Sequence, residues 1–275
     1  MGTDFTRISR RRMMQGVAGV CVAGSAQAAD AGLRIRGVDH VEFTVADVER
    51  SVAFYVKLFG GADVMKNRQT TRRYLKLGTD YIAIDRADAS RVDHFCVGIE
   101  GFDIAALHAY LMQQGMAYRD YPSGKDLAVT DPDGARMQMA AADGWTSLAS
   151  GTAAPEARAM SGTPIFRALR LDHVQLNAAD VVASSAHYEK LLGVGQGVRG
   201  RLSFAAGLGS IRIQQTPEGR QAGVDHFCVR TDRFDLEKTA TALESAGAKL
   251  EAVSEPGTVL FRDPDGFLVE AIWPL

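Results

Sequence analysis

The chain has 275 residues, 46% hydrophobic and 23% charged, which is enough for one large domain or two small ones. This composition is ordinary for a globular protein and argues against disorder, collagen-like repeats and a coiled coil. Lys and Arg number 31 and Asp and Glu 33, a net charge of -2. No basic field is therefore available for a phosphate backbone, and we expect no nucleic-acid partner.

The first 28 residues have the pattern of an export signal. Arginines at positions 10–12 precede a short apolar stretch at 16–24, and Ala26-Gln27-Ala28 offers small residues for cleavage. The apolar stretch is too short to span a bilayer, so we expect no stable membrane anchor. The paired arginines resemble a twin-arginine signal, which predicts a periplasmic or secreted protein that is exported already folded.

The rest of the chain repeats itself once. Three blocks recur in the same order and at nearly the same offset: 39–60 with 172–193, 92–97 with 224–229, and Asp-Pro-Asp-Gly at 131–134 with 263–266. The first pair is identical at 12 of 22 positions and the second at all six. Such ordered matches predict two homologous modules.

The module boundaries follow from these matches and from the composition between them. We place the first module at 36–142 and the second at 167–275. The intervening residues, 143–166, are rich in Ala, Gly, Ser, Thr and Pro without a sustained period, which predicts a linker.

Each module contains an inner repeat. In the first module, residues 40–45 alternate as a strand, Asp47 can cap a helix that ends at Gly60, and strands follow at 74–77 and 81–84.

The second half of the first module begins again in the same order. It has a strand at 92–99, a helix over 103–114, and two strands joined by the turn at 131–134. The pattern predicts an α+β fold of two tandem modules. Each module is a pair of βαβββ units that form a curved mixed sheet, or cup, into which every second strand side chain points.

Four of the six histidines occupy the first strands of the four units: His40, His94, His173 and His226. If paired units face each other across a pseudo-two-fold axis, His173 and His226 meet inside the second module. Glu270 interrupts an apolar last strand, and a buried carboxylate needs a partner. Two imidazoles and one carboxylate on one face predict a metal site with open positions for substrate.

The equivalent set in the first module is His40, His94 and Gln138. An amide oxygen is a poorer ligand than a carboxylate, so a second metal site here is expected to bind more weakly. A hydrogen-bonded core without metal is the alternative interpretation of this set.

Each first-strand histidine follows an aspartate: Asp39, Asp93, Asp172 and Asp225. Adjacent strand residues point to opposite faces, so we expect each aspartate to face away from the neighbouring ring. The two cysteines of the modules, Cys96 and Cys228, follow a histidine by two positions and are expected to be buried free thiols.

The βαβββ repeats, the first-strand histidines and the Asp-Pro-Asp-Gly turn before a last-strand acid resemble the vicinal oxygen chelate superfamily. That group includes glyoxalase I, extradiol ring-cleaving dioxygenases and bleomycin-resistance proteins. The resemblance implies that His173, His226 and Glu270 match the extradiol iron ligands in order. It also exposes a departure, because Leu260 stands where those enzymes usually have a tyrosine, and residues 250–259 contain no histidine.

Together with the export pattern at 1–28, the resemblance implies an exported enzyme with a divalent metal, Fe(II) or Mn(II) being favoured, that acts on a small molecule chelating through vicinal oxygens. A glyoxalase-like lyase or isomerase with Zn(II), Ni(II) or Co(II) is one alternative, and a non-catalytic binder of a small molecule or antibiotic is another. Glyoxalase I takes a further carboxylate from a strand where this chain offers Arg212 or Gln214, which we predict to contact substrate. A homodimer is left open.

Overall fold

The structure is a computed structural model that describes residues 33–60, 63–151, 153–156, 163–198, 200–251 and 256–273. The predicted export signal at 1–28 lies outside these residues. Within them, no helix has the length and apolar character needed to cross a membrane.

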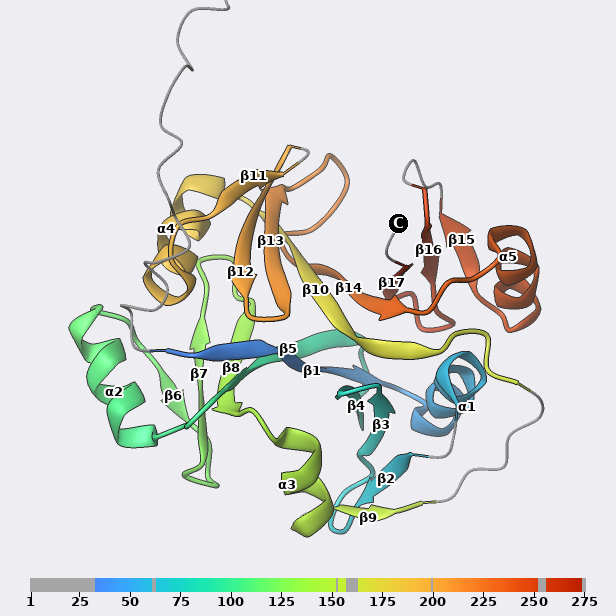
Figure 1. Ribbon diagram of the computed structural model, residues 1–275, viewed down its shortest axis with the longest axis horizontal. Helices are drawn as coiled ribbons and strands as arrows, with labels where there is room; N and C mark the ends of the chain where they lie inside the picture. Colours follow the sequence, from blue (N-terminus) through green and yellow to red (C-terminus); the bar gives the residue numbers. More distant parts are fainter. Residues whose placement is uncertain are drawn as a thin grey trace, which may run out of the picture.

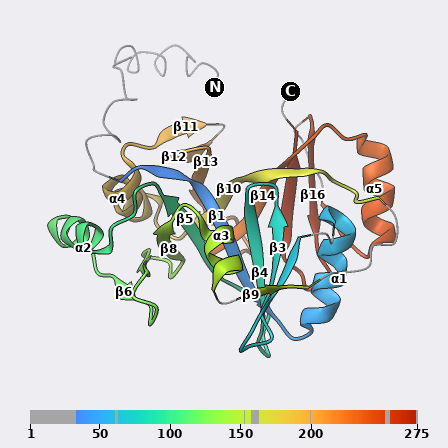
Figure 2. The same ribbon diagram turned by 60° about the horizontal axis from the view of Figure 1, so that its bottom comes forward.

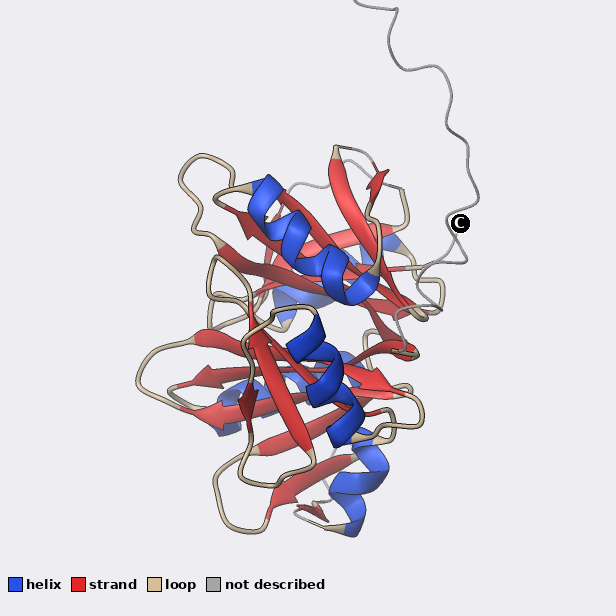
Figure 3. Ribbon diagram, turned by 90° about the vertical axis from the view of Figure 1, so that its left-hand side faces the viewer, coloured by secondary structure: helices blue, strands red, loops and turns tan. Residues whose placement is uncertain are grey.

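The described chain forms two curved mixed sheets with helices packed against them, which confirms the predicted α+β fold of two tandem modules (Figures 1 and 3). The first sheet has nine strands in the order β6-β7-β8-β5-β1-β4-β3-β2-β9, and the second has eight in the order β11-β12-β13-β10-β14-β17-β16-β15. The elements of the first module are β1 (Ile35–Val45), α1 (Val48–Phe59), β2 (Val64–Asn67), β3 (Arg73–Leu77), β4 (Asp80–Arg86), β5 (Arg91–Ile99), α2 (Ile104–Gln113), β6 (Arg119–Asp120), β7 (Asp126–Thr130), β8 (Arg136–Ala141), α3 (Gly144–Ser150) and β9 (Ala153–Pro155). Those of the second are β10 (Ala168–Ala178), α4 (Val181–Leu192), β11 (Gln196–Val198), β12 (Arg201–Ala206), β13 (Gly209–Gln215), β14 (Gly223–Thr231), α5 (Leu236–Ser245), β15 (Lys249–Glu251), β16 (Thr258–Arg262) and β17 (Leu268–Ile272).

The first strands of the paired units lie at the centre of each sheet. β1 pairs antiparallel with β5, and β10 pairs antiparallel with β14. The last strands of the two units flank each central pair, and each runs parallel to the first strand of its own unit. These parallel pairs are β1–β4 and β5–β8 in the first module, and β10–β13 and β14–β17 in the second. Residues on first strands and last strands are therefore the ones that meet in the middle of each cup.

The predicted helix signals have their expected roles. Asp47 accepts a hydrogen bond from the backbone N–H of Arg50 at the start of α1, and Asp103 caps α2 in the same way. Gly60 follows α1 with a φ of 99°, a left-handed value that favours glycine. The caps fix where each helix leaves the sheet.

The predicted linker is more structured than its composition indicates. It contains α3 and β9, and β9 joins the first sheet by pairing with β2. None of the residues of α3 is buried, so the helix shows no apolar period that the sequence could reveal. Trp145 and Leu148 instead pack partly buried against Tyr74, Tyr81 and their neighbours. This segment becomes a wall of the first cup.

The two modules contact each other through their Asp-Pro-Asp-Gly turns and their first helices. Asp263 opens the second Asp-Pro-Asp-Gly turn, and its Oδ1 accepts from the backbone N–H groups of Asp265 and Phe267 at 2.9 and 2.8 Å. Its Oδ2 accepts from the hydroxyl of Tyr55, on α1 of the other module, at 2.8 Å. Gly266 completes the turn with a φ of 91°.

The reciprocal contact exists on the other side. The hydroxyl of Tyr188, on α4, donates to Oδ2 of Asp131 in the first turn at 3.1 Å. As a result, α1 lies beside α5 and α2 beside α4 (Figures 1 and 2), and Phe43 packs on Phe267 with ring centroids 4.8 Å apart. Most buried apolar residues of both modules form one continuous core, and a smaller cluster around Tyr74 and Tyr81 lies in the first module.

Candidate metal centre

The structure brings together the three side chains predicted as ligands in the second module. His173 lies on β10, His226 on β14 and Glu270 on β17, and β14 separates the other two strands in the sheet. Oε2 of Glu270 is 3.0 Å from Nε2 of His173 and 3.2 Å from Nε2 of His226. All three residues are buried.

The four Asp-His pairs correct one expectation, because each aspartate contacts the ring that follows it. The distances from a carboxylate oxygen to Nδ1 are 2.9 Å at His40, 2.9 Å at His94, 3.0 Å at His173 and 2.8 Å at His226. The strand registers explain the difference. Pairing skips each aspartate, so it is the extra residue of a β-bulge, where strict alternation of side chains is lost.

These pairs determine what the histidines present to the site. A neutral imidazole whose Nδ1 donates to a carboxylate carries a lone pair on Nε2. The point where His173, His226 and Glu270 meet therefore collects three acceptors and no donor among them. Ligand atoms bound about 2.1 Å from one ion and 90° apart lie about 3.0 Å from each other, close to the separations from Glu270. Two imidazoles and a carboxylate thus fit a divalent metal.

The electrostatics of Glu270 favour its ionised form. Burial alone would raise the pKa of Glu270, but the neighbouring rings of His173 and His226 hold it well below its usual range. Burial likewise opposes ionisation of Asp172, yet His173 and Arg230 hold its pKa at about 2. The site therefore has an anionic ligand and an anionic support for His173 at neutral pH.

Of the two predicted substrate residues, Arg212 borders the centre and Gln214 does not reach it directly. Nη1 of Arg212 is 3.3 Å from Nε2 of His173, and Nη2 is 3.6 Å from Oδ1 of Asp172. Gln214 donates to Asn177 at 2.9 Å, and Asn177 donates to Asp225 at 2.8 Å. Gln214 therefore orients Asn177, which in turn holds Asp225 against the ring of His226.

Two further residues of this centre, Arg230 and Asn177, have no sequence signal that singled them out. Arg230 binds Asp172, with Nε at 2.7 Å from Oδ2, and Asn177 completes the chain to Asp225. Leu260 on β16 pairs directly with Glu270 on β17, so an apolar side chain stands next to the carboxylate where the resemblance would place a tyrosine. The strand position beside Glu270 thus offers no group for proton transfer.

Both cysteines of the modules are free and buried, as expected. Burial raises the pKa of the Cys228 thiol well above its usual value, and the nearby charge of Glu270 raises it further. The thiol therefore stays neutral and packs beside the centre as a small apolar group.

The first module holds the equivalent residues in a different state. Nε2 of His40 lies 3.2 Å from Nε2 of His94, while the side-chain amide of Gln138 donates to Asp126. Glu42, two residues after His40, is a buried carboxylate that the sequence reasoning missed, and Gln175 takes its place in the second module. Nη2 of Arg72 is 2.8 Å from Oε1 of Glu42.

Comparisons with known proteins support the fold. No known family model matches the sequence. The chain is similar to the metallothiol transferase FosB of Lysinibacillus sphaericus (strain C3-41), with 25% identity over 119 residues that cover 39% of this chain and 83% of the relative. In structure it is similar to the 2,3-dioxygenase LapB from Pseudomonas sp. KL28, with 17% identity, 87% of this chain and 93% of that chain covered, and a TM-score of 0.66. It is also similar to the Mn(II)-bound glyoxalase from Novosphingobium aromaticivorans, with 16% identity, 88% and 83% covered, and a TM-score of 0.64.

The chain therefore shares the fold of the 2,3-dioxygenase LapB and of this glyoxalase, in agreement with the resemblance drawn from the sequence. One of these neighbours is a Mn(II)-bound glyoxalase, and the second module of this chain has a donor set that fits a divalent metal.

Proposed function

We propose that the chain is a metal-dependent enzyme whose centre is held by His173, His226 and Glu270. The observation that carries the proposal is the convergence of three acceptors whose donors are all used elsewhere, since both Nδ1 atoms are bound to aspartates. The guanidinium of Arg212, 3.3 Å from Nε2 of His173, offsets part of their mutual repulsion, and a divalent cation between the three atoms would offset the rest. Fe(II) or Mn(II) suits two imidazoles and one carboxylate best.

A bound ion would act as a Lewis acid on a substrate that chelates it through two adjacent oxygens. The protein residues supply orientation and charge. Asp172 and Asp225 keep both rings turned with Nε2 toward the centre. Arg212 places a guanidinium 3.3 Å from Nε2 of His173, so a negatively charged substrate oxygen beside that nitrogen is stabilised. Leu260, the cross-strand partner of Glu270, adds an apolar side chain and no further ligand.

An extradiol-type dioxygenase is the reaction class that we favour, because two histidines and one carboxylate with open positions are typical of Fe(II) oxygenases. Two of the structural neighbours are named as a 2,3-dioxygenase and a catechol 2,3-dioxygenase. A glyoxalase-like isomerase needs a further acid at the metal. Among the described residues, the donors that converge with His173 and His226 include no acid besides Glu270.

A thiol transferase is the second candidate, because the similar sequence relative is named as a metallothiol transferase. A non-catalytic binder is the third candidate, and it requires no role for Glu270 in the affinity for its ligand. The assay must therefore separate oxygen consumption, thiol consumption and simple binding.

The test uses the full chain after chelation, reloaded anaerobically with Fe(II) or Mn(II). Oxygen uptake with a panel of catechols, loss of free thiol with electrophilic substrates, and isomerisation of a methylglyoxal hemithioacetal are measured in parallel. Glu270→Gln keeps the side-chain shape and removes the anionic ligand, and Asp232→Asn at an exposed ion pair is the matched control. We expect metal-dependent oxygen uptake that the first variant loses and the second keeps. A chain that binds no metal and stays inert after reconstitution refutes the proposal.

We further propose that the protein acts in the periplasm or outside the cell, on the basis of the N-terminal pattern at 1–28. Cell fractionation and determination of the mature N-terminus test this. A full-length chain recovered from the cytoplasmic fraction alone contradicts it.

A further inference from the structure

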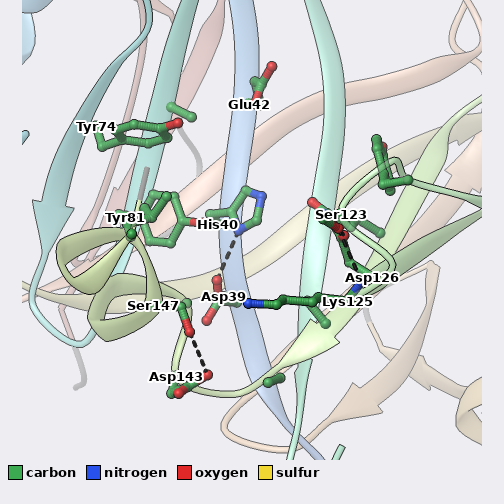
Figure 4. Close-up of a pocket in the computed structure, with 18 of the residues that line it drawn as sticks. Asp39, His40, Glu42, Tyr74, Tyr81, Ser123, Lys125, Asp126, Asp143 and Ser147 are labelled. Carbon is green, nitrogen blue, oxygen red and sulfur yellow. Dashed lines mark hydrogen bonds and ion pairs between the residues drawn. The ribbon is translucent and has the colours of Figure 1, made fainter. Parts of the chain in front are cut away.

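The first module has an open cavity of about 990 Å³ over its sheet. Figure 4 shows His40 between Tyr74 and Tyr81 on one side and Ser123, Lys125 and Asp126 on the other. The ring of Tyr81 stacks on that of His40 with centroids 4.5 Å apart. Residues of α3, which come from the predicted linker, close another side. This volume is sufficient for a small molecule above the histidines.

The two histidines at the base of the cavity leave an unfavourable contact. Nδ1 of each ring is bound to an aspartate, at 2.9 Å in both cases. Two neutral rings would then face each other through the lone pairs of Nε2, which are 3.2 Å apart. If an ion lay about 2.1 Å from both nitrogens, the angle between its two bonds to nitrogen would be about 100°, between the octahedral and tetrahedral values. The geometry of the pair fits one shared cation.

Gln138 provides a third possible metal ligand, an oxygen without a hydrogen-bond partner. Its amide nitrogen is the group that faces Asp126, because an ionised carboxylate only accepts. Oε1 is therefore turned the other way, and it is buried without a hydrogen bond in a residue that is only 8% exposed. Gln138 lines the cavity and pairs with Cys96, just as Glu270 pairs with Cys228 in the second sheet. An orphaned buried acceptor needs a cation or a donor.

We propose that the first module binds a second divalent cation through His40, His94 and Oε1 of Gln138. This site is separate from the centre at Glu270 and does not depend on the function proposed for it. All three donors are neutral, and the nearby carboxylate of Glu42 is engaged by Arg72 at 2.8 Å. The cation therefore keeps its charge and recruits a small anionic chelator into the cavity above it.

Titration of the chelator-stripped full chain with Mn²⁺, followed by the loss of the free-ion EPR signal, counts the sites. We expect two ions per chain in the wild type, one in Glu270→Ala, one in His94→Ala, and none in the double variant. The site that remains in Glu270→Ala is the weaker one, by about tenfold, because it has no anionic ligand. Oxalate, a dianion with vicinal oxygens, is expected to tighten this site several-fold.

The single variants separate this inference from the proposed function. One ion that Glu270→Ala abolishes and His94→Ala leaves intact overturns the second site alone. One ion with the opposite dependence overturns the centre at Glu270 and supports the site in the first module. Failure of oxalate to tighten the remaining site contradicts the argument from neutral donors.

A charge exchange guards against loss of binding through misfolding. In the Glu270→Ala background, Gln138→Glu combined with Asp126→Asn moves the negative charge from the support to the ligand and keeps a hydrogen bond between them. We expect Mn²⁺ affinity to rise at least tenfold, whereas Gln138→Leu abolishes binding. An unchanged affinity in the double exchange shows that position 138 is not a ligand and overturns the proposal.

Discussion

The pH dependence of stability is expected to reveal the buried carboxyl that joins the two modules. Burial raises the pKa of Asp263 from 3.8 to about 6, although Tyr55 and the backbone of Phe267 donate to it. The folded state thus holds this proton more tightly than the unfolded state. The stabilising contribution of the group is full below pH 3.8 and is lost as the pH rises through 6.

The loss amounts to about 3 kcal/mol in total, since two pKa units correspond to about 2.7 kcal/mol, and about 2 kcal/mol of it falls between pH 4.5 and 7.5. Asp263→Asn is neutral throughout and keeps an acceptor oxygen for the turn. Urea unfolding followed by circular dichroism across this range should show that the free energy of unfolding of the variant falls by about 2 kcal/mol less than that of the wild type. Asp232→Asn, at an exposed ion pair with Arg167, controls for the removal of one charge. Parallel pH profiles for wild type and Asp263→Asn would refute the reasoning.

Three further perturbations test other parts of the structure. Asp225→Ala frees the ring of His226 and should weaken metal binding at the second-module centre about 10 to 100-fold in a Mn²⁺ titration, and an unchanged affinity would contradict the orienting role. Arg212→Met should raise KM for an anionic substrate about tenfold with a smaller effect on kcat, whereas an unaltered KM would place the substrate elsewhere. Gly78→Ala should lower the free energy of unfolding by about 2 kcal/mol or more in the same urea assay. The reason is that φ is +68° at this residue and a Cβ would lie 1.8 Å from the carbonyl oxygen of Leu169. Wild-type stability of the variant would show that the modules can shift apart there.

The positions of the histidines could be predicted because the two homologous modules can be aligned with each other. The internal repeat places His173 and His226 on equivalent strands, and strand alternation then turns both toward the cup. Glu270 stands out as a charge in an apolar strand. Such features depend on local pattern alone, and the structure brings these side chains within contact distance.

The orientation of the aspartates could not be predicted, because it depends on how two strands pair. Asp172 faces His173 since the β10 and β14 registers slip by one residue at that point. The roles of Asn177 and Glu42 likewise depend on long-range partners, Asp225 and Arg72, which lie on other strands or loops. No periodicity within one segment carries this information.

The reciprocal grip of Tyr55 on Asp263 and of Tyr188 on Asp131 has a consequence for the connection between the halves. Because each half completes a turn of the other, the contacts between the halves do not depend on the covalent connection between β9 and Ile165. A chain cut there by a protease would remain one particle, and two genes encoding the separate halves could assemble as a heterodimer with both cups intact. Changes in length are accordingly expected to be tolerated between β9 and Ile165 but not in α3 and β9, which form part of the first cup.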